Sequence, residues 1–124
     1  MKTSRQDIET TIQSEQMSIG EAEWGAMHLG WETFFSEMDV APLLKGLPDD
    51  RCQCPHFGYM VKGKMYVNYQ DVAEVITAGE AYYLVPGHAV KMDSGSEVVE
   101  FSPKEEFHKT MEVVTRNLEK MQAS

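Results

Sequence analysis

The chain has 124 residues, of which 42% are apolar and 25% are charged, and its formal net charge is −9. This length and composition are typical of one soluble globular domain that buries a single core. Nucleic acids and anionic membrane surfaces bind basic protein surfaces, so the acidic charge argues against both as partners.

The first residues, MKTSRQDIETTIQ, lack the apolar run of a signal peptide, and no segment is long and apolar enough to span a membrane. We therefore expect a cytoplasmic protein. Thiols stay reduced in the cytoplasm, so Cys52 and Cys54 are predicted to be free. A disulfide that closes so short a loop would also be strained.

Residues 1–22 are predicted to form a polar N-terminal arm. The apolar residues of this arm are isolated, and only Ile8 and Ile12 have helical spacing, over a short stretch. We expect a loosely attached helix or strand that covers either a sheet edge or a partner chain.

Residues 23–102 carry a pattern of short β-strands. The segment WGAMHLGWETFFSEM is aromatic and partly alternating, which favours one or two strands, whereas the proline-containing DVAPLLKGLPDD is expected to be a loop. Six runs rich in β-branched or aromatic residues follow: FGYMVKG, KMYVNYQ, VAEVITAG, AYYLVPG, HAVKMD and SEVVEFS. Turn residues recur every eight to ten positions, which favours an antiparallel sandwich or barrel over βαβ units.

Residues 103–124 are predicted to form one amphipathic helix. Ser102 is the expected N-cap, Pro103 occupies the first helical position and Glu105 completes a capping box. Apolar residues recur along one face, which is expected to pack on the β-structure or on the same helix of a second subunit. The residues of this face are Phe107, Met111, Val114, Leu118 and Met121.

The strand series from His56 onward resembles the cupin family, through the segments HFGYMVKGKMYV and GEAYYLVPGHAV. When the first family motif is aligned on Gly63, its spacing puts His56 where cupins have a glutamate. In the second motif Pro86 and Gly87 keep the family's turn, and His88 stands two positions before the family's metal histidine. None of the four cupin metal ligands is present as written.

This resemblance implies an all-β fold, namely an antiparallel cupin jelly-roll barrel of the small, single-domain RmlC-like type over residues 23–102. The polar arm precedes the barrel and the C-terminal helix follows it, and all three segments are expected to form one structural domain. The resemblance also implies a pocket inside the barrel, without specifying a reaction, and a homodimer.

The segment RCQCPHF carries both cysteines of the chain. In an extended chain Cys52, Cys54 and His56 share one face, and the resemblance brings His88 to the same interior. Two thiols and two imidazoles make a tetrahedral ligand set for zinc, iron, nickel or copper. The competing interpretation is that the thiols are inert core residues, since free cysteine is often buried and Pro55 interrupts the alternation.

Two functional hypotheses remain open. In the first, the protein is a small-molecule-binding or sensory cupin with no catalytic residue assigned. The predicted contacts of its ligand are His56, His88, Met60, Trp31 and Tyr82. In the second, the protein is a metal-dependent cupin enzyme of the oxygenase or isomerase type, and its divalent ion is held by the same histidines and the two cysteines.

Overall fold

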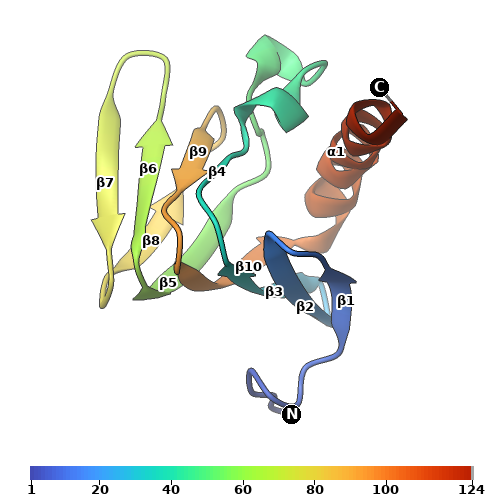
Figure 1. Cartoon of the computed structure of the whole chain (residues 1–124), viewed down its shortest axis with the longest axis vertical. Coiled ribbons are helices and arrows are strands. Elements are labelled where there is room, and N and C mark those ends of the chain that lie inside the picture. The colour runs from blue at the N-terminus through green and yellow to red at the C-terminus, as the bar shows by residue number, and fades with distance from the viewer. Residues whose placement is uncertain (124) are drawn as a thin grey trace.

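The computed structural model of the chain describes residues 1–123, which form two antiparallel β-sheets and a C-terminal helix (Figure 1). The strands of the six-stranded sheet are β1 (Thr10–Gln13), β2 (Met17–Trp24), β3 (Met27–Phe34), β5 (His56–Lys62), β8 (Ala81–Leu84) and β10 (Glu97–Pro103). The strands of the four-stranded sheet are β4 (Met38–Asp39), β6 (Lys64–Asn68), β7 (Ala73–Thr77) and β9 (Ala89–Met92). The remaining elements are the 3-10 helices η1 (Ala41–Leu44) and η2 (Pro48–Asp50) and the helix α1 (Lys104–Ala123).

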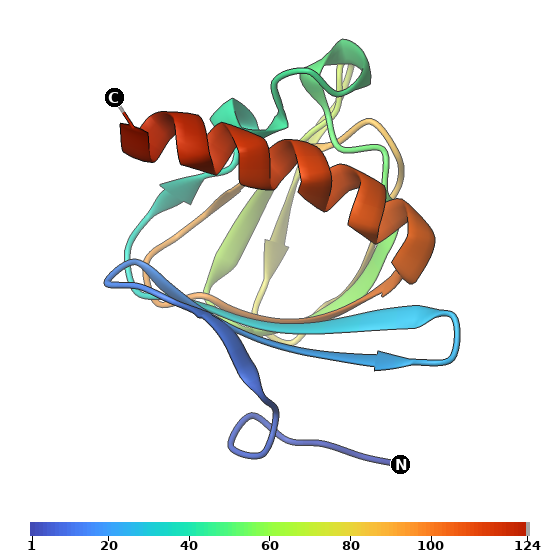
Figure 2. The same ribbon diagram turned by 90° about the vertical axis from the view of Figure 1, so that its right-hand side faces the viewer.

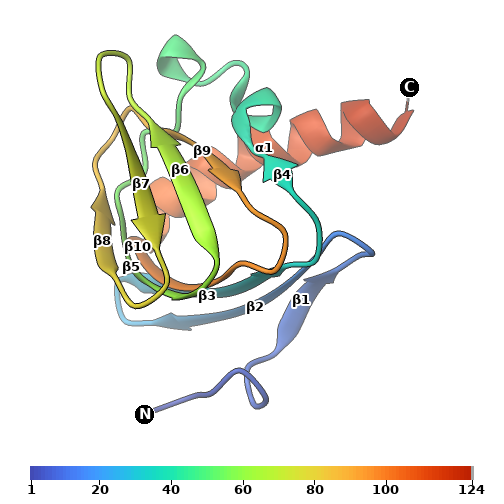
Figure 3. The same ribbon diagram turned by 60° about the vertical axis from the view of Figure 1, so that its left-hand side comes forward.

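The two sheets face each other as a sandwich (Figure 3). The strand orders are β1-β2-β3-β10-β5-β8 and β4-β9-β6-β7, and every strand pair within residues 1–123 is antiparallel. The six runs predicted as strands, from FGYMVKG to SEVVEFS, are β5 to β10 in the same order. The prediction of an antiparallel all-β fold with a C-terminal helix is therefore confirmed.

A first apolar cluster fills one part of the space between the sheets. Successive strand residues point to opposite faces, so β5 and β10 each direct alternate side chains inward. Met60 and Val98 are partners in the β5–β10 register and are 0% and 2% exposed. Burial of apolar surface contributes about 25 cal/mol per Å², so this cluster is a main source of stability. Its buried members are Phe34, Met60, Met65, Val67, Ile76, Leu84, Met92 and Val98.

Part of the segment predicted as an N-terminal arm is sheet. Strands β1 and β2 form a hairpin that extends the six-stranded sheet beyond β3. Ile8, just before β1, is buried against this hairpin. Its side chain fills the space beside Gly20, where an added Cβ would lie 2.5 Å from it. Of the two alternatives that the sequence left open, helix or strand, the structure has a strand at the sheet edge.

The start of the C-terminal helix differs from the prediction. Strand β10 pairs with β3 as far as Pro103, and the backbone N–H of Lys104 still donates to the carbonyl of Ala26 at 2.9 Å. The Ser102 hydroxyl lies 2.6 Å from Nδ1 of His56. The prediction that Ser102 is the N-cap of a capping box is therefore wrong, because sheet pairing keeps this residue in a strand and aims its side chain inward.

Helix α1 lies across the end of the barrel (Figure 2) and contacts η1. The apolar face of α1 lies over a second apolar cluster, whose buried members are Leu43, Leu44, Cys52, Cys54 and Val114. Phe107, Met111 and Leu118 pack against this cluster as predicted, whereas Met121 is 55% exposed. Among residues 1–123, no helix combines the length and the apolar character needed to cross a membrane.

Candidate functional site

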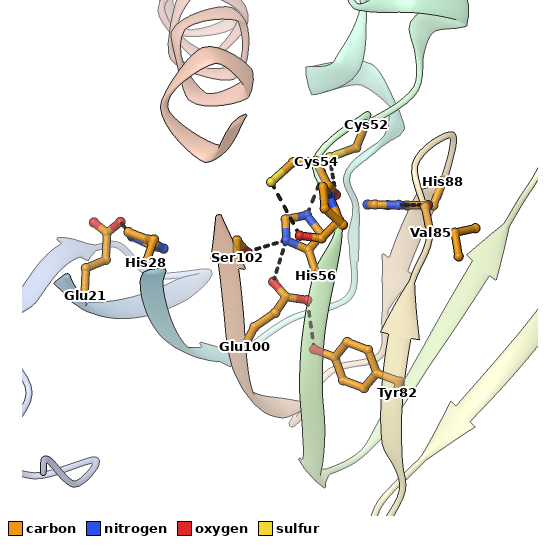
Figure 4. A network of polar contacts seen from close by, with 11 residues as sticks. Glu21, His28, Cys52, Cys54, His56, Tyr82, Val85, His88, Glu100 and Ser102 are labelled. Atoms are coloured by element: carbon orange, nitrogen blue, oxygen red, sulfur yellow. Dashed lines mark hydrogen bonds and ion pairs between the residues drawn. The ribbon is translucent and has the colours of Figure 1, made fainter. Parts of the chain in front are cut away.

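Cys52, His56 and His88 come together at the end of the barrel that α1 covers (Figure 4). His56 is the first residue of β5, and Cys52 forms an isolated antiparallel bridge with His88, whose carbonyl accepts from the Cys52 N–H at 2.9 Å. One ligand atom from each residue lies within 4.8 Å of the other two, and all three residues are buried. No other group of three potential metal ligands within residues 1–123 is this close.

The His88 ring is held in one orientation. Its Nδ1–H donates to the carbonyl of Val85 at 2.7 Å, and a carbonyl oxygen can only accept, so Nδ1 carries the proton and Nε2 has a free lone pair. Burial lowers the pKa of His88 to about 4, so the ring is neutral at neutral pH. A neutral imidazole with one nitrogen anchored to the backbone is the usual state of a metal-ligating histidine.

The His56 ring is anchored in the same way. Its Nδ1 lies 2.6 Å from the Ser102 hydroxyl and 3.8 Å from a carboxylate oxygen of Glu100. The carboxylate favours a proton on Nδ1, which leaves Nε2 directed toward the Cys52 sulfur at 3.5 Å. The His56 and His88 rings are 5.1 Å apart between centroids. The arrangement therefore directs two imidazole nitrogens and one sulfur toward a common region.

The two cysteines have different surroundings. Both are free, as predicted, and burial raises the pKa of Cys52 to about 11 and that of Cys54 to about 12. The Cys52 sulfur faces His56, whereas the Cys54 sulfur lies 3.6 Å from the carbonyl oxygen of Pro55. Cys54 is not a member of the three-residue group. The structure therefore brings together three of the four predicted metal ligands.

Glu100 and Tyr82 lie next to His56 on the inner face of the six-stranded sheet. The Tyr82 hydroxyl donates to Glu100 at 2.8 Å. Burial raises the pKa of Tyr82, and the charge of Glu100 raises it further, so the phenol keeps its proton and acts as a donor. Tyr82 was predicted as a ligand contact, and the structure places it in this network through Glu100.

Two other predicted contacts lie away from this network. Met60 is on the same inner face as His56 but is a fully buried member of the apolar cluster between the sheets. Gly30 faces inward as the partner of Glu100, so the next residue, Trp31, faces outward. Its indole N–H donates to Glu97 at 2.8 Å. The structure does not bring Trp31 to the cluster.

The sequence interpretation missed Ser102, Glu100 and Glu32, which all face inward from β10 and β3. One signal was present. A glycine inside a strand often marks the close approach of another group, and Gly58 lies in the middle of the predicted strand FGYMVKG. A Cβ at Gly58 would lie 2.4 Å from the Tyr82 ring, so this glycine lets Tyr82 reach across β5 to Glu100.

The donor set fits a transition metal. One thiolate and two imidazoles suit zinc, iron, nickel or copper, and hard cations such as magnesium prefer oxygen ligands. Three protein ligands are also the number found in catalytic zinc sites, which keep a further position for water or substrate. The anchored Nδ1 atoms of His56 and His88 supply the supporting contacts that such ligands need.

No protein-family model matches the chain, and a comparison with curated proteins finds no match. Solved structures do match. An RmlC-like cupin from Shewanella frigidimarina is 18% identical, with a TM-score of 0.57 over 82% of this chain and 88% of that one. The polyketide cyclase RemF from Streptomyces resistomycificus is 13% identical, with a TM-score of 0.57 over 83% of this chain and 78% of that one.

An oxalate decarboxylase from Bacillus subtilis also matches, at 11% identity and a TM-score of 0.59, over 82% of this chain and 28% of the decarboxylase chain. Identities this low establish the fold alone. The chain therefore has the RmlC-like cupin jelly-roll fold, as its strand series predicted.

Proposed function

We propose that this protein is a metal-dependent cupin that holds one divalent transition-metal ion on Cys52, His56 and His88 and binds a small molecule beside it. The observation that carries the proposal is the anchoring of both rings. Ser102 and the Val85 carbonyl hold the two Nδ1 atoms, so that both Nε2 atoms are available to an ion near the Cys52 sulfur.

Zinc is the ion that we expect first, because a thiolate and two imidazoles match its preferences and three protein ligands leave one position open. The Cys52 thiol is protonated in the metal-free protein, so binding releases a proton and strengthens as pH rises. When bound, such an ion acts as a Lewis acid and activates water or a substrate oxygen. The proposed location is the cytoplasm, where a reduced Cys52 is available as a ligand.

Side chains of the chain supply the rest of the proposed site. Ser102 and Glu100 keep the His56 ring in position. Glu100 and Tyr82 form a hydrogen-bonded pair beside His56, in which the Tyr82 oxygen holds a proton and Glu100 is proposed to accept from polar groups of a small molecule.

The test is elemental analysis of the protein after incubation with zinc and exhaustive dialysis. We expect about one ion per chain in the wild type, and a loss of the ion in Cys52→Ser and in His88→Gln. Cys54→Ser is the matched control, because this second thiol lies outside the three-residue group and its removal leaves the ion bound. Wild-type protein that retains no metal, with a melting temperature unchanged by a chelator, would contradict the proposal.

A second candidate function, small-molecule binding without a metal, is favoured by one observation. Every buried side-chain nitrogen and oxygen within the described residues has a hydrogen-bond partner without any ion. In this case His56 and His88 bind the ligand directly. A thermal-shift screen of small acids and sugars in the presence of chelator separates the two functions. Ligand stabilisation that persists in chelator and is lost in His56→Ala supports this candidate.

We also propose that the protein forms a homodimer through the outer face of the six-stranded sheet. Phe57 and Tyr83 stack there at 4.6 Å and are 46% and 48% exposed, and Tyr59 and Phe101 are 47% and 37% exposed. A contiguous exposed aromatic surface is typical of an interface. Analytical ultracentrifugation should show that Tyr83→Lys dissociates the dimer, whereas Val75→Lys, at a 53% exposed position on the other sheet, does not.

A further inference from the structure

A row of residues crosses the inner face of the six-stranded sheet next to the metal-ligand cluster. In the strand register Glu21 pairs with Gly30, Gly30 with Glu100, Glu100 with Gly58, and Gly58 with Tyr82. Polar side chains thus alternate with glycines across five strands. Gly58 is covered by the Tyr82 ring, whereas Gly30 lies between Glu21 and Glu100.

Gly30 and the side chains around it define what we call the Gly30 site. A Cβ added at Gly30 would lie 3.1 Å from Oε2 of Glu32 and 3.8 Å from the His28 ring. The register places Glu21 on one side of Gly30 and Glu100 on the other. Three carboxyl groups and one imidazole therefore surround a backbone position that has no side chain.

Glu32 is the member of the Gly30 site without a polar partner. Within residues 1–123 its carboxyl group makes no hydrogen bond and no ion pair, and the residue is half-buried. Burial raises the pKa of Glu32 well above its usual value, and the charges of Glu100 and Glu21 raise it further. An inward-facing carboxyl group with no partner among the described residues is available to accept a hydrogen bond from a ligand.

No lysine or arginine within residues 1–123 forms an ion pair with the carboxyl groups of the Gly30 site. Glu21 pairs with His28 at 2.6 Å, and Glu100 contacts Tyr82 and His56. Among the described residues, the lysines and arginines that do form ion pairs are Arg5 and Lys62, both with Glu97, and Lys91, with Glu37. The Gly30 site therefore carries a negative field and lacks donors on the side of Glu32.

We propose that the Gly30 site binds the ammonium group of a small primary amine, which makes the ligand of this barrel a cation. An ammonium group carries three N–H donors on one atom, and the site offers three carboxyl groups around one glycine. The same field disfavours carboxylate and phosphate ligands. The inference rests on the proposed function in one respect: Glu100 contacts both the Gly30 site and His56, so the remainder of the amine reaches the metal-ligand cluster.

The test uses the full chain and three probes with one carbon skeleton: butylammonium, butanol and butyrate. Binding is measured by isothermal titration calorimetry at constant ionic strength, with thermal shift as a second readout. We expect butylammonium to bind and to raise the melting temperature, and the alcohol and the acid to do neither. Butylammonium that fails to bind, or that binds no more tightly than butanol, overturns the proposal.

Two variants locate the binding. Glu32→Gln keeps the shape of the side chain but cannot ionise beside an ammonium group, so the affinity for butylammonium falls by about tenfold or more, as expected for one lost charge-assisted hydrogen bond. Gly30→Ala places a methyl group at the site and has a similar effect. Glu74→Gln, at an exposed position on β7, leaves the affinity unchanged. An unchanged affinity in Glu32→Gln overturns the proposal, as does equal stabilisation of the wild type by potassium chloride.

Metal content is measured in the same samples, so that the two proposals fail separately. Loss of amine selectivity in protein that retains its zinc overturns the inference about the Gly30 site alone. Selective amine binding by protein that retains no zinc overturns the metal proposal alone. Near-ultraviolet circular dichroism of Glu32→Gln and Gly30→Ala verifies that both variants keep the native packing.

Discussion

The inner face of the six-stranded sheet has two regions that are built from the same strands. In β5, Met60 belongs to the apolar cluster and His56 to the polar region, and in β10, Val98 and Glu100 are divided in the same way. Both regions follow the same alternation of strand side chains. The difference lies only in the position along the strand, so one sheet face supports both a core and a candidate binding site.

The two regions contribute to stability with opposite signs. Burial of apolar side chains such as Met60 favours folding, whereas the polar region contains a buried, neutral His88 and a half-buried Glu32 whose pKa is raised by desolvation. Sequences rarely keep such polar groups inside a barrel for the sake of the fold alone. We therefore propose that the apolar region supplies stability and the polar region supplies binding, and variants in each region test this division.

The largest expected effect is that of Met60→Ala on stability. Met60 is fully buried in the apolar cluster, so removal of its side chain leaves a cavity and lowers the free energy of unfolding by about 2–5 kcal/mol. Urea denaturation of the metal-free protein measures this change. Zinc content after dialysis should equal that of the wild type at a temperature where the variant is folded. Loss of zinc from folded Met60→Ala protein would show that the two regions are not independent.

The next effect is that of Ser102→Ala on metal affinity. Ser102 holds Nδ1 of His56, and loss of such a supporting contact lowers metal affinity by about tenfold to a hundredfold. A competition titration with a zinc chelator measures the affinity. The helix content from far-ultraviolet circular dichroism should not change, because Ser102 lies in β10 and does not cap α1.

Ser96→Ala is the matched control for Ser102→Ala. Ser96 is a buried serine just before β10, and its hydroxyl contacts the backbone of Lys64, away from His56. Its removal should cost stability without changing zinc affinity. A lower helix content in Ser102→Ala with unchanged zinc affinity would restore the capping role that the sequence indicated.

The strands were predictable because local signals mark their ends. Gly63, Gly79 and Gly87 follow predicted strands, and all three have positive φ, a conformation that glycine adopts without strain. The place of His56 close to His88 followed from its motif position. The separation of Cys52 from Cys54 was not predictable, because the two thiols share a parity in an extended chain and only the folded path shows which one faces His56.

The acidic members of the site were not predictable for a different reason. A glutamate in a strand usually faces water, and Ser102 with Pro103 and Glu105 matches a helix start. Which face Glu100 occupies depends on its register with Gly30 and Gly58 in two other strands. Such pairing between distant segments leaves no local mark on the sequence, so the polar region emerges only from the assembled sheet.

A third effect is the pH dependence of Glu32→Gln. In the unfolded chain Glu32 ionises above its ordinary pKa of 4.5, whereas the folded protein keeps the proton to higher pH. The folded state then binds more protons, so wild-type stability falls as pH rises through this window, by at most about 1.4 kcal/mol per pH unit. Glu32→Gln cannot ionise, and its stability relative to the wild type should rise with pH. Urea denaturation at several pH values measures this slope.

Glu74→Gln again serves as the control, because Glu74 is exposed and its removal should leave the pH dependence unchanged. If the stability of Glu32→Gln relative to the wild type stays constant across the window, the Glu32 carboxyl group is ionised in the folded protein. The polar region would then carry a stronger negative field than the pKa shift implies.

The smallest effect is that of Tyr82→Phe. The variant keeps the ring over Gly58 and removes only the hydroxyl that donates to Glu100. Loss of one hydrogen bond in this setting lowers the free energy of unfolding by about 0.5–1.5 kcal/mol, which urea denaturation resolves. Tyr66→Phe is the control, because its hydroxyl donates to Asp93 at an exposed position on the other sheet, where the loss should be smaller still.

Tyr82→Phe also tests whether Glu100, and not Tyr82, contacts the amine. Without the Tyr82 hydroxyl, one oxygen of Glu100 lacks a donor, and an ammonium group at the Gly30 site can supply it. Butylammonium should therefore bind Tyr82→Phe at least as tightly as the wild type, whereas Glu32→Gln binds it more weakly. If stability and binding are separate properties, Tyr82→Phe should lower the free energy of unfolding and keep or raise the affinity for butylammonium. Weaker amine binding in Tyr82→Phe would mean that Tyr82 itself contacts the ligand.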